Sequence, residues 1–345
     1  MKKFLIFLMA LCLVLPLVPT TAEEEPVLNV FSWEGYIDDE TLKAFTEETG
    51  IKVNYSTFNT NEEMVLKVTG SPNAYDLILA SDYAVNMLRK QDLLLPLSKD
   101  LLPNFANISE AFLGQYFDEK NEYAVPYTAG SPLLIYDPAL VDFEITGYED
   151  LWDERLKDSI VLIDDARNII GMTLKTMGES FNVTDDAKLE AAKEKLMKLR
   201  PNIRSFNYDS PQSDMLGGEC AVGYMFTSYL SIVLADRPDM KIVYPKEGLG
   251  FGIDALVIAK DAPHPTNAHK LINYLLDGKV GAHIAKKQGY ISPNKAAVEF
   301  MDDAVKNNPV TNIPEDMLKN AEFIQDLGTE NESKFQAIWQ EFKLH

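Results

Sequence analysis

Short runs of apolar and β-branched residues recur along the chain, and each run is bounded by glycine, proline or polar residues. Runs of about four to eight such residues are typical of buried β-strands. The sequence predicts strands at residues 27–33, 51–58, 75–80, 160–163, 221–226, 241–244 and 255–259.

Amphipathic segments with capping residues lie between these strands. The predicted helices run from Asp38 or Asp39 to Thr49, from Asn61 to Val68, and from Ala187 to Leu199. Gly50 and Pro201 follow the first and the third as stop signals. The alternation of strand and helix predicts an α/β fold with largely parallel sheets flanked by helices.

The predicted strands form two groups. One sheet takes residues before about 130 and a second takes about 150–245, and an extended segment near 131–136 joins them. The strand around Asp254 is suited to pairing back with the first sheet, so the chain crosses more than once. We therefore expect a first lobe of residues 23–131 and about 250–297, and a second of about 132–249 and 298–345.

The amino terminus has the pattern of a secretory signal peptide. Lys2 and Lys3 precede the apolar run 4–15, which is too short to span a bilayer, and Ala22 offers a small residue for cleavage. We expect residues 1–22 to be removed and the mature protein to be exported to the periplasm.

Composition and charge narrow the classes of partner. The predicted mature chain keeps one cysteine, Cys220, so a packed core has to stabilise it without an internal disulfide. The formal net charge is −21, and loss of Lys2 and Lys3 makes the mature chain two charges more negative. Such a field repels nucleic acid and anionic lipid and attracts small cations, although acidic surfaces also serve general solubility.

Aromatic and acidic residues gather where predicted strands end. Trp33, Glu34 and Tyr36 follow the first strand, and Tyr83 follows the third. In α/β proteins the ligand binds outside the carboxyl ends of the strands. An aromatic ring attracts an ammonium group, and a carboxylate supplies a charge-assisted hydrogen bond. The candidate residues for a cation site are Trp33, Glu34, Tyr36, Tyr83, Asp165, Phe226, Asp254 and Tyr290.

Ordinary structural explanations exist for single members of this set. A tryptophan at a strand end buries apolar area, and Asp165 stands where it could cap a helix that begins at Ala166. Asp164 and Asp165 are adjacent, so one acid could serve each role. The case for a ligand site therefore depends on the residues converging.

Signatures of catalysis are weak. His264 and His269 lack the His-Glu-x-x-His spacing of a zinc protease, and no nucleophile elbow or Walker loop is present. Paired acids could act as glycosidase carboxylates only at a separation that a sequence does not define. We expect no catalytic site, metal or cofactor, and an exported hydrolase stays as an alternative.

Six motifs together resemble the periplasmic spermidine/putrescine-binding proteins of bacterial polyamine ABC transporters, across essentially the whole mature length. The motifs are VFSWEGY at 30–36, EETGIKV at 47–53, AYDL at 74–77, DDAR at 164–167, YPKEG at 244–248 and GYISPN at 289–294. The resemblance implies a two-lobed periplasmic-binding-protein fold with a ligand cleft between the lobes. It also implies a monomer that closes on a polyamine by a hinge and presents it to a membrane permease.

The resemblance also implies site residues. Matching positions are Trp33, Tyr36, Ser81, Tyr83, Asp165, Phe226, Asp254 and Tyr290, with Asp254 expected to hold an amine. Phe226 stands where the family often has tryptophan, which weakens the attraction for a cation.

Four further positions depart from the family pattern. Glu34 precedes Gly35 where the family commonly shows a polar residue followed by an acid, and Asn168 stands where some members have glutamate. Gly252 replaces a tryptophan of some spermidine-selective members, and Ile324 lies near an expected glutamine. Fewer partners remain for a far amine, so the expectation is a polyamine-like cation, with putrescine slightly favoured over spermidine. Another small solute, such as an amino-acid derivative or a metal complex, stays as an alternative.

Overall fold

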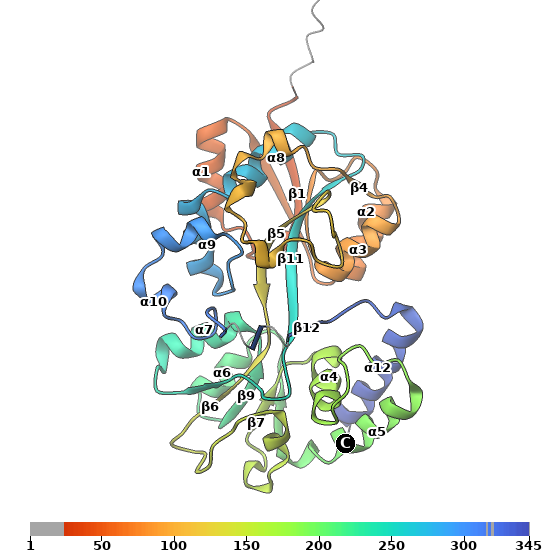
Figure 1. Ribbon diagram of the computed structural model, residues 1–345, viewed down its shortest axis with the longest axis vertical. Helices are drawn as coiled ribbons and strands as arrows, with labels where there is room; N and C mark the ends of the chain where they lie inside the picture. Colours follow the sequence, from red (N-terminus) through yellow and green to blue (C-terminus); the bar gives the residue numbers. More distant parts are fainter. Residues whose placement is uncertain (1–23, 315–316, 319–320, 345) are drawn as a thin grey trace, which may run out of the picture.

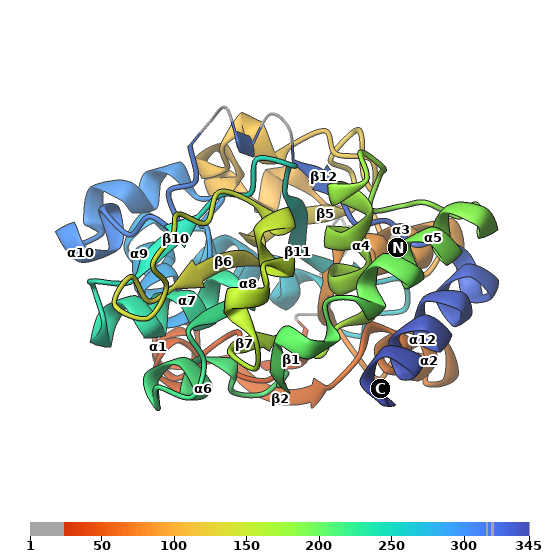
Figure 2. The same ribbon diagram turned by 90° about the horizontal axis from the view of Figure 1, so that it is seen from below.

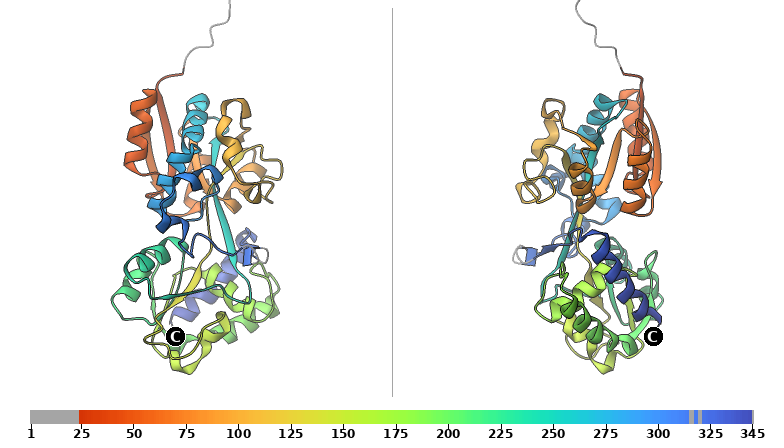
Figure 3. Two further views of the ribbon diagram at one scale, coloured as in Figure 1. Left: turned by 60° about the vertical axis from the view of Figure 1, so that its left-hand side comes forward. Right: turned by 90° about the vertical axis from the view of Figure 1, so that its right-hand side faces the viewer.

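The computed structural model describes residues 24–314, 317–318 and 321–344. The predicted signal peptide lies outside the described residues. Two α/β lobes stand one above the other, joined by a waist that β11 and its neighbours cross (Figure 1). Figure 3 shows the same waist from two other directions. Within the described ranges, no helix combines the length and the apolar character that a membrane span requires.

The upper lobe is built on a seven-stranded sheet with the order β12-β11-β3-β1-β2, in which β4 and β5 also pair with β11. Its strands are β1 (Val27–Trp33), β2 (Lys52–Phe58), β3 (Leu77–Ser81), β4 (Leu94–Leu95), β5 (Ala124–Gly130), β11 (Gly250–Ala259) and β12 (Glu322–Phe323). β1 runs parallel to β2 and β3, whereas β11 runs antiparallel to β3 and β5.

Helices flank this sheet and take their ends from local capping residues. They are α1 (Asp39–Thr49), α2 (Asn61–Gly70), α3 (Asp82–Lys90), α8 (Pro265–Leu275) and α9 (Gly278–Gln288), with the short α10 (Asp303–Lys306) beside α9. Asp38 caps α1, and Gly50 ends it in the left-handed conformation that glycine adopts freely. Thr60, rather than the predicted Asn61, caps α2.

The lower lobe has a five-stranded sheet with the order β10-β6-β9-β7-β8. The strands are β6 (Leu133–Tyr136), β7 (Ile160–Leu162), β8 (Ile203–Phe206), β9 (Val222–Met225) and β10 (Lys241–Val243). Its helices are α4 (Ala166–Thr176), α5 (Asp186–Met197), α6 (Pro211–Leu216), α7 (Thr227–Asp236) and α12 (Gly328–Leu344). Figure 2 shows α6 and α7 on one side of this sheet and α4, α5 and α12 on the other.

Short 3-10 helices fill the connections. They are η1 (Lys99–Leu101), η2 (Pro103–Asn107), η3 (Glu110–Phe112), η4 (Tyr148–Trp152), η5 (Glu154–Leu156), η6 (Arg200–Asn202) and η7 (Lys295–Phe300).

The central strands are buried on both faces, as parallel sheets covered by helices require. In β3, Leu77 and Leu79 face one apolar cluster while Ile78 and Ala80 face another, and all four are fully buried. This burial explains why the strands read as continuous apolar runs in the sequence. The α/β prediction with two helix-flanked sheets is confirmed.

The chain crosses between the lobes repeatedly. It passes from β5 to β6 at 131–132, returns from β10 to β11 at 244–249, and descends again between α10 and α12. The expected residue ranges of the lobes stay a prediction. The boundary expected near 297 differs from the structure in one respect, because the chain stays with the upper lobe beyond it. There α10 lies against α9, and Lys286 Nζ donates to Asp302 at 2.7 Å.

Candidate functional site

The upper edge of the site forms where β1 and β3 end. β1 ends at Trp33 and β3 ends at Ser81, and the antiparallel strand β11 places Asp254 opposite Ser81. A bulge in the pairing of β11 with β5 follows Asp254 directly. Carboxyl ends of parallel strands are where α/β folds place ligands, so this edge of the sheet faces the lower lobe with its functional groups.

Asp254 is held by two hydroxyl groups. Ser81 Oγ donates to Asp254 Oδ1 at 2.6 Å, and the Tyr36 hydroxyl donates to Oδ2 at 2.9 Å. Burial raises the pKa of Asp254, and the hydrogen bonds from Ser81 and Tyr36 oppose that rise. The residues that the structure describes supply no cation to this carboxylate. The group is therefore oriented and able to receive an ammonium ion.

Aromatic rings surround this carboxylate. The ring centres of Trp33 and Tyr36 lie 6.3 Å apart, and those of Tyr36 and Tyr290 lie 6.0 Å apart. Burial raises the pKa of Tyr290 to about 12, so its hydroxyl stays neutral at physiological pH. Neutral rings around a half-buried acid form the wall that an alkyl ammonium needs.

The lower edge forms on the second sheet. β7 runs parallel to β8 and β9, and Leu162 pairs with Phe206 on one side and Tyr224 on the other. The segments that follow these three strands therefore leave the sheet at one edge. They carry Asp165 after β7, Tyr208 after β8 and Phe226 after β9.

The two adjacent acids after β7 have separate roles. Asp164 Oδ1 accepts hydrogen bonds from Trp339 Nε1 at 2.7 Å and Lys343 Nζ at 2.8 Å, which tie α12 to the lobe. Asp165 Oδ1 accepts from the backbone N–H of Asn168 at 2.8 Å and so caps α4. Burial raises the pKa of Asp165. Asp165 thus has the capping role, while Asp164 belongs to an ion pair.

The two edges act on each other electrostatically. Burial, together with the Glu62 and Asp165 carboxylates, raises the pKa of Tyr83 on α3 of the upper lobe. Partial burial raises the pKa of Tyr208 in the lower lobe, and the charges of Asp165 and Asp254 add to it. Each tyrosine thus has an acid of the opposite lobe among the causes of its raised pKa. A direct contact joins the lobes as well, because Ser231 Oγ donates to the Gly289 carbonyl at 3.0 Å, next to Tyr290.

Most of the predicted site residues lie along these two edges. Trp33, Tyr36, Ser81, Asp254 and Tyr290 gather on the upper edge. Asp165 and Phe226 lie on the lower edge, with the Phe226 ring 6.4 Å from that of Tyr208.

Two predicted residues are oriented differently. Glu34 is exposed, and no hydrogen bond or ion pair to its carboxylate occurs within the described parts of the chain. Tyr83 turns its hydroxyl toward α2, where it accepts from Asn61 Nδ2 at 3.0 Å and donates to Glu62 at 3.2 Å. The hydroxyl of Tyr83 is therefore occupied by residues of α2.

Sequence reasoning missed two residues of the site. Asp82 is buried, and in the sequence it stands between the predicted site residues Ser81 and Tyr83. That position could have indicated that Asp82 lies near the site. Tyr208 is 47% exposed at the lower edge, and its carbonyl accepts the Tyr229 hydroxyl at 2.8 Å. Because β8 was not predicted, nothing indicated that Tyr208 follows a strand end.

The departures noted in the sequence have visible consequences. A Cβ at Gly252 would meet only Asp82 Oδ2, at 3.9 Å, so this stretch of β11 borders open space. Asn168 is buried, and its Oδ1 has no hydrogen-bond partner among the described residues, which leaves an acceptor next to Asp165. Ile324 packs against Gly250 at the start of β11. A Cβ added at Gly250 would lie only 3.1 Å from Ile324 Cδ1.

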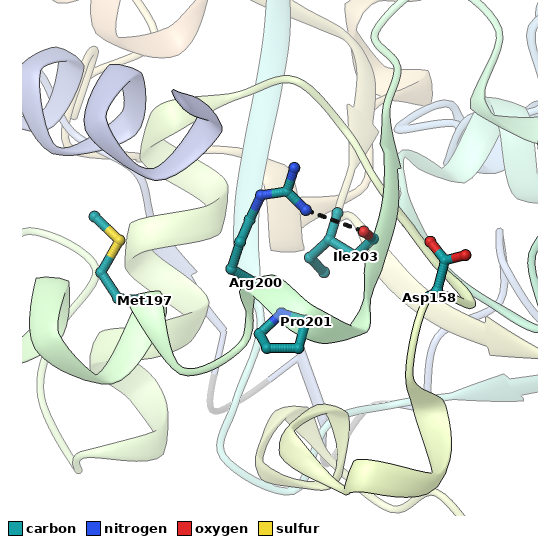
Figure 4. Close-up of a pocket in the computed structure, with 5 residues that line it drawn as sticks. All are labelled: Asp158, Met197, Arg200, Pro201 and Ile203. Carbon is teal, nitrogen blue, oxygen red and sulfur yellow. Dashed lines mark hydrogen bonds between the residues drawn. The ribbon is translucent and has the colours of Figure 1, made fainter. Parts of the chain in front are cut away.

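A separate depression lies in the lower lobe (Figure 4). It has a volume of about 480 Å³ and is lined by Asp158, Met197, Arg200, Pro201 and Ile203. Ile203 begins β8, so the depression sits at the amino end of a strand whose carboxyl end leads to Tyr208. Arg200 donates to the Ile203 carbonyl at 3.2 Å across it. It is therefore distinct from the edge that carries Asp165.

Candidate metal ligands have structural partners. Asp38, Glu40 and His283 bring one ligand atom each within 4.8 Å of one another. Asp38 already caps α1, and its carboxylate lies 3.3 Å from His283 Nε2, so a hydrogen bond between the two side chains explains their proximity. His264 lies 3.1 Å from Asp76, and His269 Nε2 accepts the backbone N–H of Ser98 at 2.9 Å.

Known proteins share both the sequence and the fold. Residues 40–312 match the family described as bacterial extracellular solute-binding protein. The spermidine/putrescine-binding periplasmic protein of Escherichia coli strain K12 is 35% identical over 346 residues, covering 99% of each chain. A putrescine/cadaverine-binding protein of Pseudomonas aeruginosa is 27% identical, covering 94% of this chain and 95% of its own.

A solved structure of a polyamine-binding protein resembles this chain in fold as well as in sequence. The spermidine/putrescine ABC transporter substrate-binding protein of Streptococcus pneumoniae has a TM-score of 0.83 and 32% identity, covering 92% of this chain and 98% of its own. The resemblance that the motifs indicated is confirmed, because the family is described as extracellular solute-binding, the Escherichia coli relative as periplasmic, and the Streptococcus pneumoniae protein as an ABC transporter substrate-binding protein. The chain belongs to the bacterial extracellular solute-binding proteins and is similar along its whole length to those that bind spermidine and putrescine.

Proposed function

We propose that this chain is an extracytoplasmic receptor that binds putrescine or spermidine and delivers it to an ABC permease. The observation that carries the proposal is Asp254, a half-buried carboxylate that Ser81 and Tyr36 orient and aromatic rings surround. Among the described residues, none places a cation beside it. A buried charge without a partner is costly, and an ammonium ligand removes that cost. The names of the relatives support the same ligand class.

In the proposed complex the ligand spans the two edges. One ammonium group meets Asp254 on the upper edge, the methylenes lie against Trp33, Tyr290 and Phe226, and the second ammonium group meets Asp165 on the lower edge. Asn168 Oδ1, a buried acceptor, lies next to Asp165 and supports an amine at that end. A ligand that touches both edges stabilises the arrangement in which the lobes face each other.

The remaining parts of the proposal concern the cell. The amino-terminal 22 residues act as a signal peptide that is cleaved near Ala22, and the mature protein works in the periplasm as a monomer. It acts as a carrier and not as an enzyme, and it does not bind nucleic acid. Its lobes comprise residues 23–131 with about 250–297 and about 132–249 with 298–345, except that α10 and β12 lie with the first lobe. The negative net charge suits a cationic ligand.

The test is a calorimetric titration of the mature chain from Glu23 with putrescine, spermidine and 1,4-butanediol. The diol has the four-carbon chain of putrescine but no charge, so it isolates the contribution of the ammonium groups. We expect both polyamines to bind and the diol to bind at least about 100-fold more weakly, because each charge-assisted hydrogen bond contributes about 1.5–3 kcal/mol. Equal affinity for the diol, or preference for an anionic solute, would contradict the proposal.

A further inference from the structure

A second acid is buried directly behind the ligand site. Asp82 is the first residue of α3, follows Ser81, and is 3% exposed. Asp82 Oδ1 accepts the backbone N–H of Tyr83 at 2.6 Å and the Tyr116 hydroxyl at 3.2 Å. Asp82 Oδ2 accepts the backbone N–H of Ile253 at 3.1 Å. Its known partners are neutral donors, and none of the ion pairs in the described parts of the chain includes it.

Asp82 and Asp254 are linked through each other's neighbours. Ser81, which precedes Asp82, donates to Asp254, and Ile253, which precedes Asp254, donates to Asp82. The pairing of β11 with β5 is irregular directly after Asp254, so the regular ladder is interrupted where the acid is presented. The bond from Ile253 to Asp82 holds the backbone at this point.

We propose that Asp82 is a positioning residue for the ligand site, which fixes β11 at Ile253 so that Asp254 faces the cleft and which gives up a proton as a cationic ligand arrives. The inference rests on the proposed function, because it requires a cation at Asp254. It adds a residue that does not touch the ligand and a proton that leaves when the ligand binds.

The groups around Asp82 act on its pKa in opposite directions. Burial raises the pKa of Asp82 to about 7, the negative charge of Asp254 on β11 adds to it, and the bonds from Ile253, Tyr83 and Tyr116 oppose it. The titratable groups that face Asp82 are Asp254 and the Tyr116 hydroxyl, since the Tyr83 hydroxyl turns toward Glu62. An ammonium group at Asp254 offsets the negative charge there, so the pKa of Asp82 falls and its proton moves to solvent.

The sign of the pH effect follows by linkage. A ligand that releases a proton binds more tightly as pH rises, and the slope reaches at most one decade of affinity per pH unit for one proton. We expect putrescine affinity to rise by up to about tenfold between pH 6 and pH 8, and then to level off. Amines of the lysine type titrate near about pH 10, so the ligand keeps its charge in this window.

The test is calorimetry with putrescine at pH 6, 7 and 8 in two buffers of different ionisation enthalpy, which counts protons released per ligand. Wild type should release a fraction of a proton near pH 7, and Asp82→Asn should release none and lose the pH slope. Asp76→Asn is the matched control, because Asp76 is equally buried and accepts backbone N–H groups of Asn29 and His264, but lies before the opposite end of β3. It should keep the slope.

A second variant keeps the test decisive if Asp82→Asn folds poorly. Tyr116→Phe removes one hydrogen bond that lowers the pKa of Asp82, so the pH at which affinity rises should move upward. A wild type that binds putrescine without releasing protons would overturn this inference alone, as would an unchanged slope in Asp82→Asn or an unmoved midpoint in Tyr116→Phe. A wild type that binds no polyamine would overturn the proposed function as well.

Discussion

Asp254 is the residue on which the chemistry of the site depends. Two neutral donors orient it, and no cation of the described residues pairs with it, so a bound ammonium group supplies the positive charge in the proposed complex. We expect Asp254→Asn to weaken putrescine binding by about 2–5 kcal/mol, because the bound ligand covers the charge pair and truncating one member leaves the other unpaired. Titration calorimetry measures this loss.

The control for this prediction is another acid on the same segment. Asp261 is exposed just beyond β11, and Asp261→Asn removes the same charge from the surface. An exposed charge contributes less than about 1 kcal/mol, so this variant should bind like wild type. Equal affinity of the Asp254 and Asp261 variants would remove Asp254 from the site.

At the residue scale, the sequence predicted groups that follow recognisable strand ends. Trp33, Tyr36 and Asp254 follow or lie in apolar runs that form β1 and β11. Tyr208 follows β8, whose four residues include the exposed Arg204 and resemble a surface segment, so the signal was absent. Glu34 shows a second reason why the sequence does not define the site fully. It follows a recognisable strand end but is exposed, because a shift of one residue decides which way a side chain points.

Asp165 belongs to the element scale, because it caps α4 and also receives the second ammonium group in the proposed complex. Asparagine is as good a helix cap as aspartate, whereas alanine loses the cap at a cost of about 1 kcal/mol. We expect Asp165→Asn to keep the free energy of unfolding within about 0.5 kcal/mol and to weaken putrescine binding, while Asp165→Ala weakens both. Chemical denaturation and calorimetry together separate the two effects.

Asp165 could instead act only as the cap of α4, and the same two variants would show this. If Asp165→Asn binds putrescine like wild type while Asp165→Ala is less stable, Asp165 is a cap and nothing more. In that case the second amine has to find its acceptor elsewhere on the lower edge, and the buried Asn168 Oδ1 becomes the first candidate.

Helices and strands with a local signal were predictable, and those that depend on tertiary pairing were not. The caps Asp38 and Gly50 define α1 in sequence and in structure. β11 begins at Gly250, five residues before its predicted start at 255, because its glycine-rich beginning is stabilised by pairing with β5 and β12. Glycine disfavours strands locally, so pairing partners outweighed local propensity.

At the scale of the whole molecule, the alternation of elements predicted two sheets but not how the lobes touch. Ser231 Oγ on α7 of the lower lobe donates to the carbonyl of Gly289 at the end of α9, at 3.0 Å. Gly289 has a φ of 65°, and a Cβ there would lie 2.9 Å from Ser231 Cβ. This contact sits next to Tyr290, so it ties the position of a wall residue to the approach of the lobes.

Substitution at this contact should separate the lobes. Gly289→Ala places a methyl group against α7 and disfavours the left-handed backbone, so we expect a larger radius of gyration and weaker putrescine binding. Ser231→Ala removes the hydrogen bond without adding bulk and should have a smaller effect in the same direction. A Gly289→Ala protein with the wild-type radius of gyration would show that the contact does not limit opening.

Solution X-ray scattering of the mature wild-type protein, with and without saturating putrescine, tests the central claim most directly. That claim is that one cation bridges carboxylates of the two lobes, through Asp254 above and Asp165 below. The account predicts that putrescine reduces the radius of gyration and that 1,4-butanediol at the same concentration does not. A protein that binds putrescine by calorimetry but keeps the same radius of gyration would contradict it.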